Sequence, residues 1–323
     1  MRIAAALAVA LLAAAHPAAL PKVTATYHIT ATKVLGGDGG WDYLSYDPAT
    51  KRLFISRSTH VMVLDTQTGN VVGDIPNTAG VHGIAIADDL GKGFTSNGRD
   101  ATVTVFDLAS LKTLGTITLA AKNPDGITYD PVTHRVFTFD GGSNDATAID
   151  ATTDTVVATI PLGGRPEFPV IDGKGMVYDN IESTNEIVAI DAAKATVTKR
   201  FPLGSCQSPS GLSMDQAHRR LFAACRGEMG IVDADSGKVV AKVKTGAGTD
   251  ATRFDGTTGF AFAPNGRDAT LTVVHQDDPD HYSIAQNATT VMGARTMEID
   301  PATGTIFLVT AAPGAFELVT LEQ

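Results

Sequence analysis

Apolar and polar residues alternate in short runs along almost the whole chain, and one such run keeps returning. Two alternating segments joined by a polar turn occupy residues 43–54, 126–137, 211–222 and 296–307, with weaker copies at 83–94, 168–178 and 251–262. The turn aspartates of the copies are Asp47, Asp88, Asp130, Asp172, Asp215, Asp255 and Asp300. Successive aspartates are 40 to 45 residues apart. This period predicts seven copies of one supersecondary unit, each packed against its neighbours.

The first copy shows what the unit contains. Alternation predicts strands at residues 43–46, 52–56, 60–64 and 71–75. Asp-Pro and Thr-Gly pairs fall between them; proline presets φ, glycine accepts a positive φ, and aspartate bonds its own backbone, so these pairs form turns. A second turn aspartate recurs as Asp65, Asp107, Asp150, Asp191 and Asp233. Four short strands in about 40 residues are typical of one β-propeller blade.

The seventh copy lacks one strand, and the N-terminal region has one to spare. The last copy supplies segments 297–299, 305–309 and 316–321 only, whereas residues 27–34 alternate but have no partner in the first copy. Pairing segment 27–34 with the seventh blade as its outer strand would cover an unpaired sheet edge. We therefore expect an all-β, seven-bladed β-propeller of four-stranded antiparallel blades, closed by the N-terminal strand and forming a single domain over residues 20–323.

The repeats also resemble a known family. The pattern G-I-x-Y-D-P-x-T-x-R-V-F and the segments G-G-D-G-G-W-D-Y (36–43) and G-A-R-T-M (293–297) are similar to those of YncE-like β-propellers with YVTN repeats. The resemblance runs from about residue 27 to the end of the chain. It departs from WD40 repeats, since no Trp-Asp pair closes a blade. The resemblance implies a seven-bladed and mostly bacterial exported protein, and it implies little chemistry, because most members lack an established activity.

The first residues have the features of a secretory signal. Arg2 precedes an apolar run over residues 3–15, and small residues suited to cleavage follow at 13–15 and 17–19. The run of 13 apolar residues is shorter than the roughly 20 that span a bilayer. We expect a signal peptide over residues 1–19 and a periplasmic or secreted, monomeric mature chain with no membrane span.

Polar residues precede the predicted innermost strands, in loops that should meet on one face around the mouth of the central channel. These candidate ligand-binding residues are Trp41, Asp42, His82, Asp125, Glu167, Asp250 and Arg295. An acidic ring with one histidine suits a divalent cation or a cationic ligand, with His82, Asp125, Glu167 and Asp250 as candidate metal ligands. The alternative is that these groups only cap strand ends. Trp41 is either a platform for the ligand or a packing residue.

The two cysteines, Cys206 and Cys225, predict a disulfide if the chain is exported. The 18 residues between them would give a gain of roughly 3 kcal/mol on the loop-closure account. The alternative is a metal-thiolate pair with His82. The motif N-G-R-D at 97–100 and again at 265–268 is interpreted as a turn. His134 and His218 share one turn position and are expected to face solvent, and segment 275–281 is expected to be an acidic loop.

The net charge and the absence of known catalytic motifs argue against several classes of function. The net charge of −10 disfavours nucleic acid, whose binding depends on neutralising phosphates. No Gly-x-Ser-x-Gly, nucleotide-binding or His-Glu-x-x-His motif occurs. The preferred hypothesis is a non-enzymatic binding or scaffold protein for a small ligand, a metal ion or a periplasmic protein partner. One alternative is a metal-dependent lactonase or lyase with His82 as the base. Another, by family analogy only, is binding of single-stranded DNA.

Overall fold

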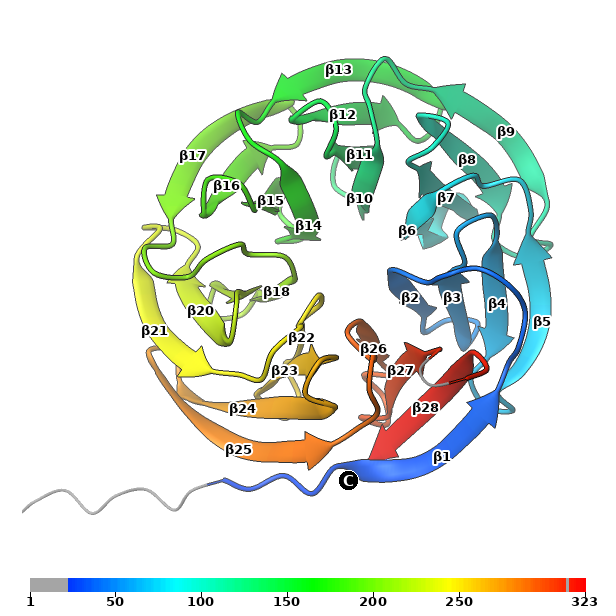
Figure 1. Ribbon diagram of the computed structural model, residues 1–323. Helices are drawn as coiled ribbons and strands as arrows, with labels where there is room; N and C mark the ends of the chain where they lie inside the picture. Colours follow the sequence, from blue (N-terminus) through cyan, green and yellow to red (C-terminus); the bar gives the residue numbers. More distant parts are fainter. Residues whose placement is uncertain (1–22, 312–313) are drawn as a thin grey trace, which may run out of the picture.

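The computed structural model describes residues 23–311 and 314–323, so the predicted signal peptide over 1–19 lies outside the described residues. Seven four-stranded antiparallel sheets are arranged in a closed ring around a common centre (Figure 1). This confirms the predicted seven-bladed propeller. Among the described residues, no helix has the length and apolar character of a membrane span.

Each blade contributes one strand to each of four concentric layers. The innermost strands are β2 (Leu44–Asp47), β6 (Val81–Ala87), β10 (Pro124–Asp130), β14 (Pro166–Ile171), β18 (Leu212–Asp215), β22 (Arg253–Asp255) and β26 (Met297–Ile299). The second strands are β3 (Arg52–Ser56), β7 (Lys92–Asn97), β11 (Arg135–Asp140), β15 (Met176–Ile181), β19 (Arg220–Ala224), β23 (Phe260–Asn265) and β27 (Ile306–Thr310). The third strands are β4 (Val61–Asp65), β8 (Thr102–Asp107), β12 (Asp145–Asp150), β16 (Glu186–Asp191), β20 (Glu228–Asp233), β24 (Thr270–Asp278) and β28 (Glu317–Glu322). The outermost are β5 (Asn70–Ile75), β9 (Thr113–Thr118), β13 (Thr155–Pro161), β17 (Thr196–Pro202), β21 (Val239–Lys244), β25 (His281–Thr289) and β1 (His28–Val34). A 3-10 turn, η1 (Asp88–Leu90), connects β6 and β7 in the second blade.

The ring closes as predicted. Strand β1 pairs antiparallel with β28, from His28 opposite Glu322 to Val34 opposite Glu317, and completes the sheet β1-β28-β27-β26 (Figure 1). Tyr27, just before β1, packs edge-on against Phe262 of the sixth blade with ring centroids 5.4 Å apart. The N-terminal strand thus covers the edge of the last blade, and the residue before it reaches the blade next to it.

The core lies between the blades. The second and third strands are almost wholly buried, while the outermost strands are mostly exposed. An aromatic residue recurs at the same place in the second strand, as in Phe54, Phe94 and Phe137, and each is fully buried. Phe54 faces Phe106 of the next blade with ring centroids 5.8 Å apart. Because each blade buries both faces against its neighbours, the middle strands read as continuous apolar runs.

The basic residue that begins several second strands ties neighbouring blades together. Arg52 donates from Nη1 to the carbonyl oxygen of Leu108, 2.8 Å away in the next blade. Arg135 makes the equivalent bond to Ala192 at 2.6 Å, and Lys92 reaches Asp154 at 2.8 Å. The repeated sequence therefore encodes contacts between the units as well as the units themselves.

Candidate functional site

A cavity of about 1060 Å³ opens at the channel mouth, on the face where the loops lead into the innermost strands. Six of the seven residues that the sequence analysis singled out line it, namely Asp42, His82, Asp125, Glu167, Asp250 and Arg295. Sequence reasoning did not single out Arg165, Glu182, Arg226 and Arg267, which line it too. The charged wall is therefore assembled from all parts of the ring.

Bulges in the pairing of two innermost strands place His82 and Asp125 at the channel mouth. The register of β6 against β7 shifts between Val81 and Ile84, and that of β10 against β11 shifts between Pro124 and Ile127. His82 and Asp125 lie inside these bulges, which re-aim side chains at the end of a strand. A glycine follows each of the two. A Cβ on Gly126 would lie 2.2 Å from the carbonyl oxygen of Glu167, so only glycine permits this close approach of neighbouring blades.

Two serines at the ends of second strands hold this backbone in place. Ser96 Oγ accepts the N–H of Gly83 at 2.9 Å and donates to the carbonyl oxygen of Asp125 at 2.5 Å, so it links the second and third blades. Ser56 Oγ accepts the N–H of Asp42 at 3.0 Å. These buried hydroxyls position the carboxylates without taking up their side-chain oxygens.

Asp42, His82 and Asp125 form one cluster. His82 Nδ1 lies 2.7 Å from Asp42 Oδ2 and 3.6 Å from Asp125 Oδ1. One ligand atom from each of the three lies within 4.8 Å of the others. Burial by itself lowers the pKa of His82, but the hydrogen bond with Asp42 and the charges of Asp125 and Asp42 outweigh it and raise this pKa to about 9. The imidazole is therefore protonated at neutral pH when no cation is bound.

Asp125 is the least exposed member of the cluster. The residue is only 6% exposed, and burial raises its pKa to about 6. Within the described part of the chain its carboxylate contacts His82 at 3.6 Å and accepts no hydrogen bond. A buried carboxylate normally takes two or more hydrogen bonds, so Asp125 has unused acceptor capacity directed into the cavity.

Glu167 and Asp250, the other two predicted metal ligands, lie apart from this group and pair with arginines. Glu167 is 3.1 Å from Arg165, and Asp250 accepts from Arg295 Nε at 2.9 Å. Burial and the charge of Asp125 raise the pKa of Glu167 to about 8. The cluster thus joins Asp42, a predicted ligand-binding residue, to the metal candidates His82 and Asp125, and it does not include Glu167 or Asp250.

Trp41 lies beside the cavity and packs against the protein. Its ring is 5.8 Å from that of Phe316, and the guanidinium of Arg295 lies over it at 5.0 Å from the ring centroid. Arg295 also donates to the carbonyl oxygen of Trp41 at 2.8 Å. These contacts favour the packing interpretation, in which Trp41 orients Arg295.

Tyr43, which lines the mouth cavity, belongs to an aromatic pair. Tyr43 packs edge-on against Phe168 with ring centroids 4.8 Å apart, and the guanidinium of Arg253 lies 4.9 Å from the Phe168 ring centroid. Arg253 is in turn paired with Glu298. Tyr43 and Phe168 both line a second cavity of about 240 Å³, so this pair lies where the two cavities meet.

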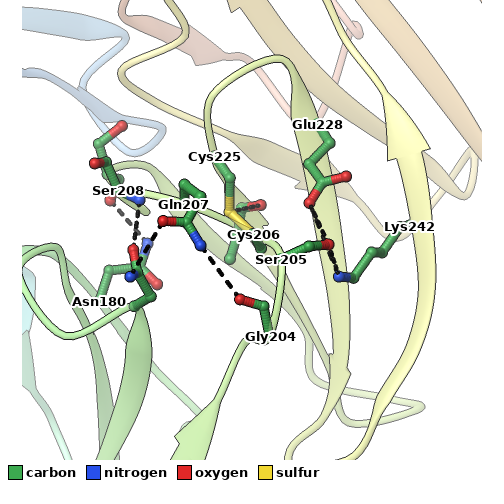
Figure 2. Close-up of a disulfide and its surroundings, with 12 residues drawn as sticks. Asn180, Gly204, Ser205, Cys206, Gln207, Ser208, Cys225, Glu228 and Lys242 are labelled. Carbon is green, nitrogen blue, oxygen red and sulfur yellow. Dashed lines mark hydrogen bonds and ion pairs between the residues drawn. A yellow bond between two sulfur atoms is a disulfide. The ribbon is translucent and has the colours of Figure 1, made fainter.

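Cys206 and Cys225 form a disulfide, as predicted, with their Cα atoms 5.4 Å apart (Figure 2). Sulfurs joined in this way are not thiolate ligands, so the alternative pairing with His82 does not arise. Asn180 Nδ2 donates to the carbonyl oxygens of Ser210 and Gly211, each at 2.9 Å. The disulfide and these bonds fix the loop that leads into β18, and Cys225 itself lines the cavity.

The remaining sequence features are structural. Asn97 Nδ2 donates to Thr102 and Thr104, and Asn265 makes the same pair of bonds in the sixth blade. A Cβ on Gly98 would lie 2.8 Å from His82 Nε2, so the N-G-R-D turn also makes room for the histidine. His134 and His218 lie about half exposed in their turns, as expected. Segment 275–281, which the sequence predicts to be a loop, instead contains the end of β24, a short turn and the first residue of β25, because the two strands stay paired as far as Asp278 and His281. Arg220 contacts this turn through Asp280 at 2.9 Å.

No model of a known protein family matches the sequence, and no curated protein matches it. Solved structures do. The WD40 repeats of RRP9 superpose with a TM-score of 0.80 at 10% identity, covering 92% of this chain and 100% of theirs. The β-propeller domain of Cps50 (Swd1) from Myceliophteria thermophila gives 0.76 at 13% identity over 92% and 100%. Hydrazine synthase from Kuenenia stuttgartiensis gives 0.75 at 15% identity over 90% and 98%. At these identities the likeness shows the fold alone: the chain is similar to seven-bladed propellers, WD40 domains among them.

Proposed function

We propose that this chain is an exported binding protein of the YncE-like kind that its repeats resemble, and that its channel mouth holds a cationic ligand. In its simplest form the ligand is a divalent metal ion bound by Asp42, His82 and Asp125. The observation that carries the proposal is Asp125, a buried carboxylate with no hydrogen bond in the described structure, directed into a cavity and next to two further ligand groups.

The dimensions and chemistry of the cluster suit such an ion. Protein ligands bind divalent cations at about 2.0–2.6 Å, so ligand atoms around one ion lie within about 5 Å of one another. The three ligand atoms here lie within 4.8 Å. Two carboxylates and one imidazole are donors for Mn²⁺ or Zn²⁺, and carboxylates also suit Ca²⁺. A cation would also take the place of the proton on His82 and relieve the repulsion between Asp42 and Asp125.

Two other roles receive less support. A lactonase or lyase that uses a cation in this cluster would need His82 as its base, but the proposed site already uses this imidazole as a ligand of the ion. The carboxylate-rich mouth and the net charge of −10 disfavour single-stranded DNA. A binding role needs only the three ligand groups of the cluster and no separate catalytic base.

Metal analysis of the purified chain, followed by calorimetric titration with Mn²⁺, Zn²⁺ and Ca²⁺ after chelation, tests the proposal. We expect one ion per chain, and Asp125→Asn should weaken binding at least 100-fold because it removes a charged ligand. Asp250→Asn is the matched control, since it removes a cavity carboxylate outside the cluster, and it should change affinity less than threefold. If none of the three ions binds stoichiometrically, or if both variants lose affinity equally, the metal site is wrong.

A further inference from the structure

The mouth cavity carries positive charge on the side away from the Asp42, His82 and Asp125 cluster. Four arginines line it. Arg165 and Arg295 are each paired with cavity carboxylates, at 3.1 Å from Glu167 and 2.9 Å from Asp250. For Arg226 and Arg267, the described structure contains no ion pair and no hydrogen bond from the guanidinium. Two cavity arginines are therefore available to something other than the protein.

Arg226 and Arg267 occupy equivalent loops in neighbouring blades. Arg226 lies between β19 and β20 of the fifth blade, and Arg267 lies between β23 and β24 of the sixth. The cluster is built by Asp42, His82 and Asp125 at the start of the first three blades. The cavity is consequently divided, with unused acceptors on the wall of the first three blades and unused donors on the wall of the fifth and sixth.

Fixed backbone presents both arginines. The N–H of Arg226 donates to the carbonyl oxygen of Gln207 at 3.1 Å, one residue after the disulfide-bonded Cys225. The N–H of Arg267 donates to Ala247 at 3.1 Å. A Cβ on Gly248, whose φ is +81°, would lie 2.7 Å from Arg267 Cγ. The aliphatic part of the Arg267 side chain therefore packs directly against the backbone of this glycine. Loops held in this way limit the entropy lost when a ligand binds.

We infer that a small molecule bound between the proposed cation and the opposite wall carries an oxyanion, a carboxylate or a phosphate, which lies against Arg226 and Arg267. Guanidinium groups bind both anions through paired, charge-assisted hydrogen bonds. The ligand class is then a small organic acid, with its anionic end on the fifth and sixth blades and its other end toward the cation. A cavity of about 1060 Å³ is large enough for such a molecule. This inference rests on the proposed cation site for the second half of the ligand.

The arginines can be tested without metal, using acetate and inorganic phosphate as separate probes. Titrations of the chelated full chain are followed by NMR, through line broadening of the probe at constant ionic strength. We expect saturable millimolar binding of at least one probe, and the tighter of the two identifies the anion. The double variant Arg226→Gln, Arg267→Gln should weaken binding of this probe at least tenfold, because it removes both guanidinium groups. The variant should still fold, since both side chains are exposed.

Arg99→Gln is the matched control. Arg99 holds the place of Arg267 in the other copy of N-G-R-D, and it does not line the cavity. Arginine-dependent binding that survives Arg99→Gln supports the inference. Absence of saturable binding of both probes, or equal binding by the double variant, overturns it. Mn²⁺ titration of the same double variant separates the two proposals. The double variant should still bind Mn²⁺, because it keeps Asp42, His82 and Asp125. The metal site is tested by Asp125→Asn, independently of the anion probes.

Discussion

Carboxylates stand at both ends of the strands in this propeller, and their surroundings are opposite. On the turn side, hydrogen bonds from Thr68 to Asp65 and from Ser110 to Asp107 lower the pKa of each aspartate. At the mouth end, burial raises the pKa of Asp125 to about 6 and that of Asp140 to about 7. The same residue type is stabilised as an anion at one end and penalised as an anion at the other.

The difference lies in how near the partners are in sequence. A turn aspartate finds its donors two to four residues away; Asp172 Oδ1, for example, accepts from the N–H groups of Lys174 and Met176. The carboxylates that line the mouth meet groups from other blades: Asp125, for example, lies 3.6 Å from His82, which is one whole repeat away. Asp140 keeps its partners Thr138 and Thr147 in its own blade, and burial is the main cause that raises its pKa. Turn aspartates therefore stabilise the fold. The ionised carboxylates of the mouth are destabilised by burial and mutual repulsion, and a bound cation can reduce both effects.

The largest effect is expected at Asp140. It is fully buried and bonded to Thr138 and Thr147, in the position that Asn97 and Asn265 hold in their blades. Burial raises its folded-state pKa from 3.8 to about 7, so the stability it contributes is present below pH 4 and is lost as the pH rises through 7. Asp140→Asn should make the chain more stable at pH 8, by up to about 4 kcal/mol, and have little effect at pH 4.

Urea unfolding of Asp140→Asn and the parent chain at pH 4, 6 and 8 measures this. The reverse change, Asn97→Asp, is the control, and it should introduce a pH-dependent loss in the second blade. Equal stability changes at pH 4 and pH 8 would contradict the assignment.

A moderate effect is expected at Asp172 on the turn side. This residue is buried, accepts two backbone N–H groups, and pairs with Arg219 at 3.1 Å. Asp172→Ala leaves those donors without partners and should cost about 2–3 kcal/mol at neutral pH. Thermal and urea unfolding report it, and an exposed aspartate such as Asp74 gives a comparison value near zero when replaced by alanine. A loss below about 0.5 kcal/mol, the usual value for a surface substitution, would remove the distinction between the two ends.

The smallest effect is expected at Glu167. Its folded-state pKa is raised from 4.5 to about 8 by burial and by Asp125, so its contribution to stability is present below about pH 4.5 and is lost as the pH rises through 8. Glu167→Gln removes that loss but also removes the ion pair with Arg165. We expect a net gain of about 1 kcal/mol at pH 9 and none at pH 4, measured by urea unfolding of Glu167→Gln and the parent chain at these two pH values. A loss at pH 9 would show that the ion pair dominates.

The repeat, the number of blades, the closing strand and the disulfide could all be predicted from the sequence, because each is recorded in a short pattern or a count. The turn aspartates belong to the same class, since their partners are two to four residues away. A recurring signal for the mouth was also visible: His82-Gly83 and Asp125-Gly126 both place a polar residue before the glycine of a bulge.

Which of the mouth residues contact one another could be seen only in the tertiary structure. The ring brings Asp42, His82 and Asp125 together, leaves Glu167 and Asp250 with arginines, and turns Trp41 toward Phe316. It also leaves Arg226 and Arg267 without partners in the described structure. These outcomes depend on the register of each bulge and on the distance between blades, which long-range packing sets and no local pattern of residues records.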